Sequence, residues 1–144
     1  YLASFPTPSP LLFQTSIHPS AVQQVMIGRQ RALQRFWPIT GGARLVEQAL
    51  LAGLLDPARR CFFLGGEERG TWMLEHGMAS DRAFACATVL TRDAEGAQGR
   101  VSFTAESNIV STPCPTLAQW ADALVDRTPL RWAGVGGAWR MEWS

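Results

Sequence analysis

The hydrophobic and polar positions of residues 130–143 alternate on both sides of a glycine cluster at residues 134–137. A period of two on either side of such a cluster predicts a β-hairpin at this end of the chain. A two-residue turn would place Val135 at positive φ, a conformation that a β-branched residue resists. We therefore expect residues 134–137 to form a four-residue loop.

The same alternation predicts the register of this hairpin. Trp132 is expected opposite Trp139 on an apolar face that packs into the core. On the other face Arg131 is expected opposite Arg140, and like charges in facing positions repel. Glu142 lies on the diagonal, where its carboxylate can relieve this repulsion.

Three other stretches have the spacing of amphipathic or buried helices. The first is expected to run from residue 19 to residue 37 and to end before Pro38. The second covers residues 43–55, is apolar on most sides and is therefore expected to be buried. The third begins at Thr116, whose hydroxyl can form a capping box with Gln119, and ends before Pro129.

Short apolar or alternating runs between turn residues predict strands at residues 11–17, 60–66, 70–78, 83–90 and 99–106. The predicted order is therefore a strand, two helices, four strands, a helix and a hairpin. Short connections favour antiparallel neighbours. This segregated order predicts an α+β fold that has a mainly antiparallel sheet, two N-terminal helices, one later helix and a C-terminal β-hairpin. Residues 1–10 contain three prolines and are expected to be a lead-in or linker, with residues 11–144 forming a single α+β domain.

Composition narrows the possible functions. The chain of 144 residues is 47% hydrophobic and 17% charged, which is typical of one globular domain. All 13 basic residues are arginine, so this segment has neither a Schiff-base lysine nor a phosphate-loop lysine. Because no helix can follow the glycine cluster within the seven remaining residues, that cluster is expected to be only a turn.

Candidate chemistry is sparse. Cys61 and Cys86 lie in predicted strands and are expected to be buried, whereas Cys114 lies between two prolines and is expected to be the exposed thiol. Cys114 and His76 are the candidate catalytic pair if the chain is a small thiol-dependent hydrolase or transferase. Carboxylates at turns and strand ends offer a carboxylate-dependent alternative, namely Glu67, Glu68, Glu75 and Asp81. The cysteine and histidine spacing fits no zinc pattern, so we expect neither a metal nor a cofactor.

Four arginines are candidate interface residues, namely Arg31, Arg35, Arg131 and Arg140. They leave open an arginine-mediated nucleic-acid binder. However, the net charge is only +1, and domains that depend on phosphate contacts are usually more basic. Arg29 and Arg31 also point about 200° apart on a helix, so they do not form one stripe.

The first hypothesis is therefore a non-enzymatic protein-interaction or assembly module with a protein partner. The closing helix-then-hairpin order resembles small α+β modules of bacterial secretion and pilus machinery. This likeness of element order implies a part of a larger bacterial envelope or secretion-type machine. No apolar run is long enough to span a bilayer, and the pattern leaves open both the bacterial cytoplasm and the cell envelope. The first residue is Tyr rather than Met, so we expect a processed chain or a piece of a longer one.

Overall fold

The computed structural model describes residues 20–32, 35–40, 42–67, 74–75, 80–105 and 112–144. The chain divides into two units, Tyr1–Pro38 and Ile39–Ser144, and each is described by itself. The predicted lead-in at residues 1–10 and the predicted strand at residues 11–17 lie outside the described residues. The predicted boundary at residue 10 therefore stays a prediction.

In the first unit, helix α2 covers Ser20–Gly28 and is shorter than predicted. The helix ends because Gln30 adopts a left-handed conformation, with φ at 51°. The backbone N–H of Arg31 donates to the carbonyl of Met26, and that of Gln30 donates to the carbonyl of Ile27. These two bonds form a Schellman motif, which terminates a helix. The predicted continuation to residue 37 is therefore wrong.

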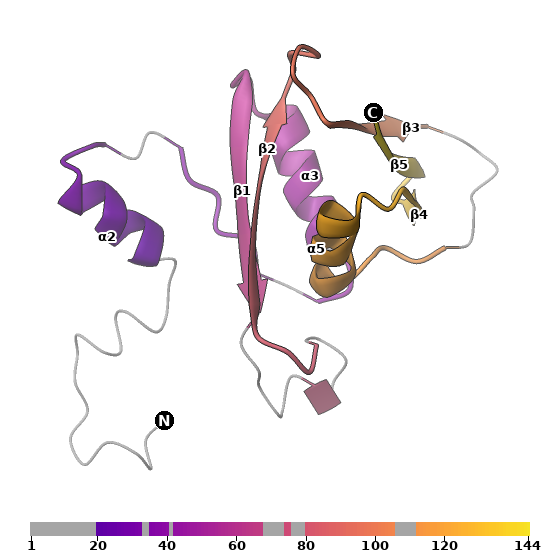
Figure 1. The fold of residues 1–144 in the computed structure, drawn as a ribbon, viewed down its shortest axis with the longest axis horizontal. Helices are drawn as coiled ribbons and strands as arrows, with labels where there is room; N and C mark the ends of the chain where they lie inside the picture. The colour runs from indigo at the N-terminus through magenta and orange to yellow at the C-terminus, as the bar shows by residue number, and fades with distance from the viewer. Residues whose placement is uncertain (1–19, 33–34, 41, 68–73, 76–79, 106–111) are drawn as a thin grey trace. The chain divides into compact units, whose positions relative to one another are not determined.

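The second unit confirms the α+β class, the later helix and the C-terminal hairpin (Figure 1). Its strands form two antiparallel sheets, a two-stranded sheet β1-β2 and a three-stranded sheet of order β3-β5-β4. Its helices and strands are α3 (Leu45–Leu55), β1 (Arg60–Glu67), β2 (Phe84–Thr91), β3 (Gly99–Thr104), α5 (Leu117–Asp126), β4 (Leu130–Gly134) and β5 (Gly137–Trp143).

The strand predicted at residues 70–78 is not supported by the part of it that the structure describes. Leu74 and Glu75 are helical, and the other residues of that stretch lie outside the described ranges. The predicted strands at residues 60–66, 83–90 and 99–106 correspond to β1, β2 and β3.

The closing hairpin has the predicted register but not the predicted loop. Trp132 lies opposite Trp139, and Arg131 lies opposite Arg140. The strands pair up to Gly134 and Gly137, so the turn has two central residues rather than a four-residue loop. Of these two, only Gly136 has a positive φ, of 75°. This pattern is that of a type II turn, in which the glycine takes the positive φ and the β-branched Val135 before it keeps a negative φ.

The core of this unit is a cluster of buried side chains around the two stacked indole rings of Trp132 and Trp139, whose centroids are 5.9 Å apart. The ring of Trp120 from α5 meets Trp132 edge-on, at a centroid distance of 6.2 Å. The buried members of the cluster are Val46, Leu50, Trp120, Ala123, Trp132, Trp139 and Met141. They come from two helices and the closing hairpin, so the hairpin is part of the core.

Helices α3 and α5 differ in how well their sequence patterns predict burial. Thr116 and Gln119 form both bonds of the predicted capping box at the start of α5. Helix α3 is less buried than expected, because Leu54 is 42% exposed and Leu55 is 81% exposed. Its burial is confined to one side, on which Val46, Glu47 and Leu50 lie.

Candidate functional site

The outward face of the β1-β2 sheet is apolar. Side chains along β1 and β2 alternate between half-buried and exposed. Phe62 of β1 is 76% exposed and lies opposite Val89 of β2, while Leu64 is 62% exposed and lies opposite Ala87. Gly66 lies opposite Ala85 at the next position of the same face. We call the residues Phe62, Leu64, Gly66, Ala85, Ala87 and Val89 the apolar face.

The inward face of the same sheet is covered by α3 and α5. A methyl group on Gly53 of α3 would lie 2.6 Å from the ring of Phe63, so the helix packs closely on β1. A methyl group on Gly65 would lie 3.3 Å from the side chain of Leu117 in α5. Because α3 and α5 pack on one face only, the apolar face is left as the outer surface of this sheet among the described residues.

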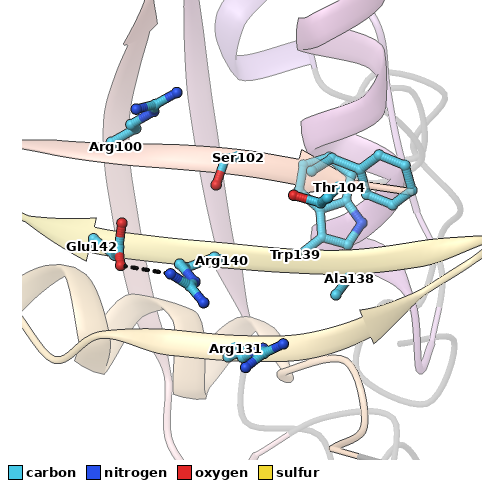
Figure 2. A pocket seen from close by; sticks show the side chains of 9 residues that line it. Arg100, Ser102, Thr104, Arg131, Ala138, Trp139, Arg140 and Glu142 are labelled. Atoms are coloured by element: carbon cyan, nitrogen blue, oxygen red, sulfur yellow. Dashed lines mark hydrogen bonds and ion pairs between the residues drawn. The ribbon is translucent and has the colours of Figure 1, made fainter. Parts of the chain in front are cut away.

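The outward face of the three-stranded sheet is polar and basic (Figure 2). Ser102 of β3, Arg140 of β5 and Arg131 of β4 lie in one row across the three strands. We call this row the arginine row. Arg140 donates to the carboxylate of Glu142 at 3.3 Å, and both side chains are about half exposed.

A hollow of about 410 Å³ lies over this face. Beside the arginine row, the pair Thr104 and Ala138 presents small side chains, which leaves the space. On the other side of the row, Arg100 lies opposite Glu142. The charged side chains that line the hollow are thus three arginines and one glutamate.

The structure brings two of the four predicted interface arginines together. Arg131 and Arg140 face each other across β4 and β5, as the alternation predicts. Arg31 and Arg35 are exposed in the first unit, beyond the end of α2. His76 lies outside the described residues, so its pairing with a thiol stays a prediction.

The prediction that Cys114 is an exposed loop thiol is wrong. Its side chain is half-buried and packs against the core cluster. Burial raises the pKa of the Cys114 thiol, and burial likewise raises the pKa of Cys86. A reactive thiol requires the opposite shift. Pro115 beside it is buried whereas Pro113 is exposed, so the segment turns in toward the core at Cys114 and Pro115.

Cys61 and Cys86 are free and are placed too far apart to form a disulfide. Cys61 pairs with Leu90, whereas Cys86 pairs with Gly65. Four residues along a strand span about 13 Å, well beyond the Cα separation of a disulfide.

Thiol labelling provides a test of these placements. We expect Cys86 and Cys114 to react several-fold more slowly with a maleimide at pH 7 in the native chain than in urea. The reason is that burial restricts access and lowers the thiolate fraction. Mass spectrometry of peptides from timed reactions gives the rate at each cysteine. Equal native and denatured rates at Cys114 would show that its segment is not packed as described.

Glu47 is the residue with the most unusual environment, and the sequence pattern did not single it out. Its side chain is only 2% exposed. One carboxylate oxygen accepts the backbone N–H of Val135 at 2.8 Å and the indole N–H of Trp139 at 3.4 Å. The other accepts the guanidinium of Arg44 at 2.6 Å. The feature of the sequence that could have indicated this role is that Glu47 is an acidic residue three positions after Arg44, in a helix expected to be buried.

Burial alone would raise the pKa of Glu47, but its hydrogen bonds outweigh burial. The bonds from Arg44 and Val135, the positive charge of Arg44 and the bond from Trp139 hold the pKa of this carboxyl below its usual value. The carboxylate is therefore charged at neutral pH and ties α3 to the turn of the closing hairpin. This arrangement gives Glu47 a structural function.

The carboxylate candidates from the sequence are not gathered into a site among the described residues. Glu67 accepts hydrogen bonds from the backbone N–H and the hydroxyl of Ser80, at 2.7 and 2.8 Å. Glu75 and Asp81 are exposed. Glu68 lies outside the described residues. Within the ranges that the structure describes, no three His, Cys, Asp or Glu side chains are close enough together to hold a metal ion.

Comparison with known proteins gives no assignment: no protein-family profile matches the chain, and no curated protein or solved structure is significantly similar to it. In the described part of the chain, none of the helices has the length and hydrophobicity needed to cross a membrane.

Proposed function

We propose that this chain is a non-enzymatic protein-interaction module that binds a partner protein through the apolar face of β1-β2. The observation that carries the proposal is the exposure of Phe62 and Leu64, at 76% and 62%, on strands whose other face is packed. Contiguous exposed apolar patches on ordered elements often mark protein-interaction sites.

The proposed occupant is the apolar side of an amphipathic helix from the partner. Sheets are stable when a further layer covers each apolar face, and α3 with α5 supply that layer on the inner side only. The six residues of the apolar face are uncharged, and the next outward side chain of β1 beyond Phe62 is the exposed Arg60, so the partner segment is expected to be apolar along most of this surface. The apolar face covers five residues of each strand, about 17 Å, which a helix of about 11 residues would cover.

The size of the face favours a transient partner over a permanent dimer. Two strands over this length present about 160 Å². Stable interfaces usually bury about 800 Å² on each partner. Any partner that covers this face alone would bury too little area for a permanent complex, so the face suits a module that binds and releases.

The other hypotheses receive less support. The thiol-dependent enzyme would need a thiol with a lowered pKa, and burial raises the pKa of both Cys86 and Cys114. A place in a bacterial envelope or secretion-type machine stays a prediction, because an α+β fold of this kind is compatible with many functions.

Photo-crosslinking tests the proposal. Phe62 is replaced by benzoylphenylalanine, which keeps an aromatic ring on the apolar face, and cells that produce the chain are irradiated. We expect a discrete covalent adduct with one partner protein. Adding Leu64→Asp to the same chain should reduce the adduct at least fivefold, because it places a charge in the proposed interface.

The matched control places the same photoreactive residue at Val125, which is 82% exposed on α5 and apart from the apolar face. This position should give no discrete adduct. Equal yields from positions 62 and 125 would contradict the proposal, as would an adduct with twice the mass of the chain. Circular dichroism of each variant confirms that the fold is intact.

A further inference from the structure

The apolar face is higher at one end than at the other, and an exposed arginine lies just beyond its higher end. We propose that the partner helix carries a bulky apolar side chain over the lower end and an acidic side chain beside Arg60, about 14 positions apart. The inference rests on the proposed function, because it names the side chains by which a partner helix is recognised on that same face.

The size of the side chains along the face is the first argument. The three cross-strand pairs are, in order, Phe62 with Val89, Leu64 with Ala87, and Gly66 with Ala85. We call Gly66, Ala85 and Ala87 the low end, because none of them has a side chain larger than a methyl group. All three residues are exposed. A bulky side chain from the partner helix would fill the space over the low end while the helix rests on Phe62 and Val89, which gives the close fit typical of interface cores.

The pairing of the strands keeps this end low. A methyl group on Gly66 would lie 2.7 Å from the carbonyl oxygen of Phe84 on β2, closer than non-bonded carbon and oxygen atoms approach. A side chain at position 66 would therefore disturb the pairing of β1 with β2. The space over Gly66 is thus a fixed feature of the sheet, and a side chain from the partner can occupy it.

Charge at the opposite end is the second argument. Arg60 is exposed and occupies the next outward position of β1 beyond Phe62. Its neighbour Arg59 forms an ion pair with Asp93 at 2.5 Å, whereas Arg60 has no hydrogen-bond or ion-pair partner among the described residues. A guanidinium group can donate two parallel hydrogen bonds to one carboxylate. An acidic side chain at this end of the partner helix would therefore complement Arg60.

The length of the strand gives the spacing of the two side chains. Arg60 and Gly66 are six positions apart on β1, which is about 20 Å in an extended strand. On a helix aligned with the strands, side chains 14 positions apart are separated by about 21 Å. Fourteen positions are also close to four full turns, so both side chains lie on the stripe that faces the sheet.

Fluorescence anisotropy with synthetic helical peptides at low ionic strength tests this inference. The first probe is a labelled 17-residue peptide with a stripe of leucine and alanine, one tryptophan and, 14 positions later, one glutamate. The second probe has lysine in place of the glutamate, and the third has alanine in place of the tryptophan. We expect the first peptide to bind the unmodified chain at least threefold more tightly than either of the other two.

Exchanging the charges tests the contact at Arg60. Arg60→Glu should weaken binding of the glutamate peptide about fivefold and strengthen binding of the lysine peptide by a similar factor, because it reverses the pair. Arg100→Glu is the matched control, since it makes the same change of charge at an exposed position of the other sheet. It should change both affinities less than twofold.

Filling the low end tests the contact of the bulky side chain. Ala87→Leu should weaken binding of the tryptophan peptide about tenfold and that of the alanine peptide less than twofold, because only the indole ring needs the space. Ala94→Leu, at an exposed position outside the strands, is the matched control and should leave both affinities unchanged. Circular dichroism of each variant confirms that the fold is intact.

Equal binding of the three peptides to the unmodified chain would overturn the inference, as would failure of all three to bind. Equal losses of the glutamate peptide in Arg60→Glu and Arg100→Glu would also overturn it, because they would show an effect of net charge alone. The crosslinking experiment at Phe62 tests the proposed function separately, because its adduct does not depend on which side chains the partner helix carries.

Discussion

Replacing Trp139 with alanine is expected to lower the free energy of unfolding by about 3–5 kcal/mol. The side chain is 0% exposed and is stacked on Trp132 in the centre of the core. Its other side contacts Phe103, at a centroid distance of 5.1 Å, and its N–H donates to Glu47. Alanine would leave a cavity that these neighbours cannot close. The loss would be a large share of the roughly 5–15 kcal/mol that stabilises a typical domain.

Urea denaturation followed by far-ultraviolet circular dichroism measures this loss. Val135→Ala is the control in the same hairpin, because its side chain is 71% exposed at the turn. We expect a change of less than about 0.5 kcal/mol for this control. If Trp139→Ala unfolds at nearly the same urea concentration as the unmodified chain, the stacked indole rings are not the centre of the core.

Replacing Glu47 with alanine is the second change with a large expected effect, a loss of roughly 3 kcal/mol. Alanine would leave the backbone N–H of Val135 and the indole N–H of Trp139 without their acceptor. Each buried donor left without a partner costs about 1–3 kcal/mol. The half-exposed guanidinium of Arg44 can turn to water, so it adds little to the loss.

The same carboxylate predicts how stability depends on pH. Its pKa is lower in the folded chain than its usual value near 4.5, so the unfolded chain binds the proton more readily. The stabilisation by Glu47 is therefore fully present above that usual pKa. It is lost as the pH falls through the lower pKa of the folded state.

Glu47→Gln isolates this contribution, because glutamine keeps the size and one acceptor but not the charge. Urea denaturation between pH 7 and pH 3 should give a shallower acid loss for Glu47→Gln than for the unmodified chain. Glu142→Gln is the control, since that carboxylate is 54% exposed. Its acid loss should follow that of the unmodified chain. Identical profiles for Glu47→Gln and the unmodified chain would show that the buried carboxylate does not carry the effect.

The sequence predicted best those features that depend on neighbours in the chain. The alternation around Gly136 specified which side chains of the closing hairpin face the core and which face solvent. The capping box of Thr116 and Gln119 located the start of α5, because the residues that form it are only three positions apart. Both patterns depend on residues that are close together in the chain, so they can be recognised without knowing how distant segments pack.

Features that depend on distant segments were not predictable in this way. Alternation along β3 indicates a strand, but it does not indicate that β3 pairs with β5 rather than with β2. Phe62 and Leu64 read as core residues from their type, and only the one-sided packing of the helices leaves them exposed. Arg131 and Arg140 were placed together correctly, whereas Ser102 joins their row through the pairing of β3 with β5.

The link between Glu47 and the hairpin turn also bears on the order in which the chain folds. The two bonded groups are 88 residues apart, so their meeting closes a long loop of the chain, at a large cost in entropy. The hairpin itself closes over two residues, and such hairpins form in about 1–10 μs. We therefore expect the turn to form before its buried acceptor arrives. Docking of α3 by this carboxylate belongs to the late, long-range part of folding, and it distinguishes the finished core from a collapsed chain with the same local elements.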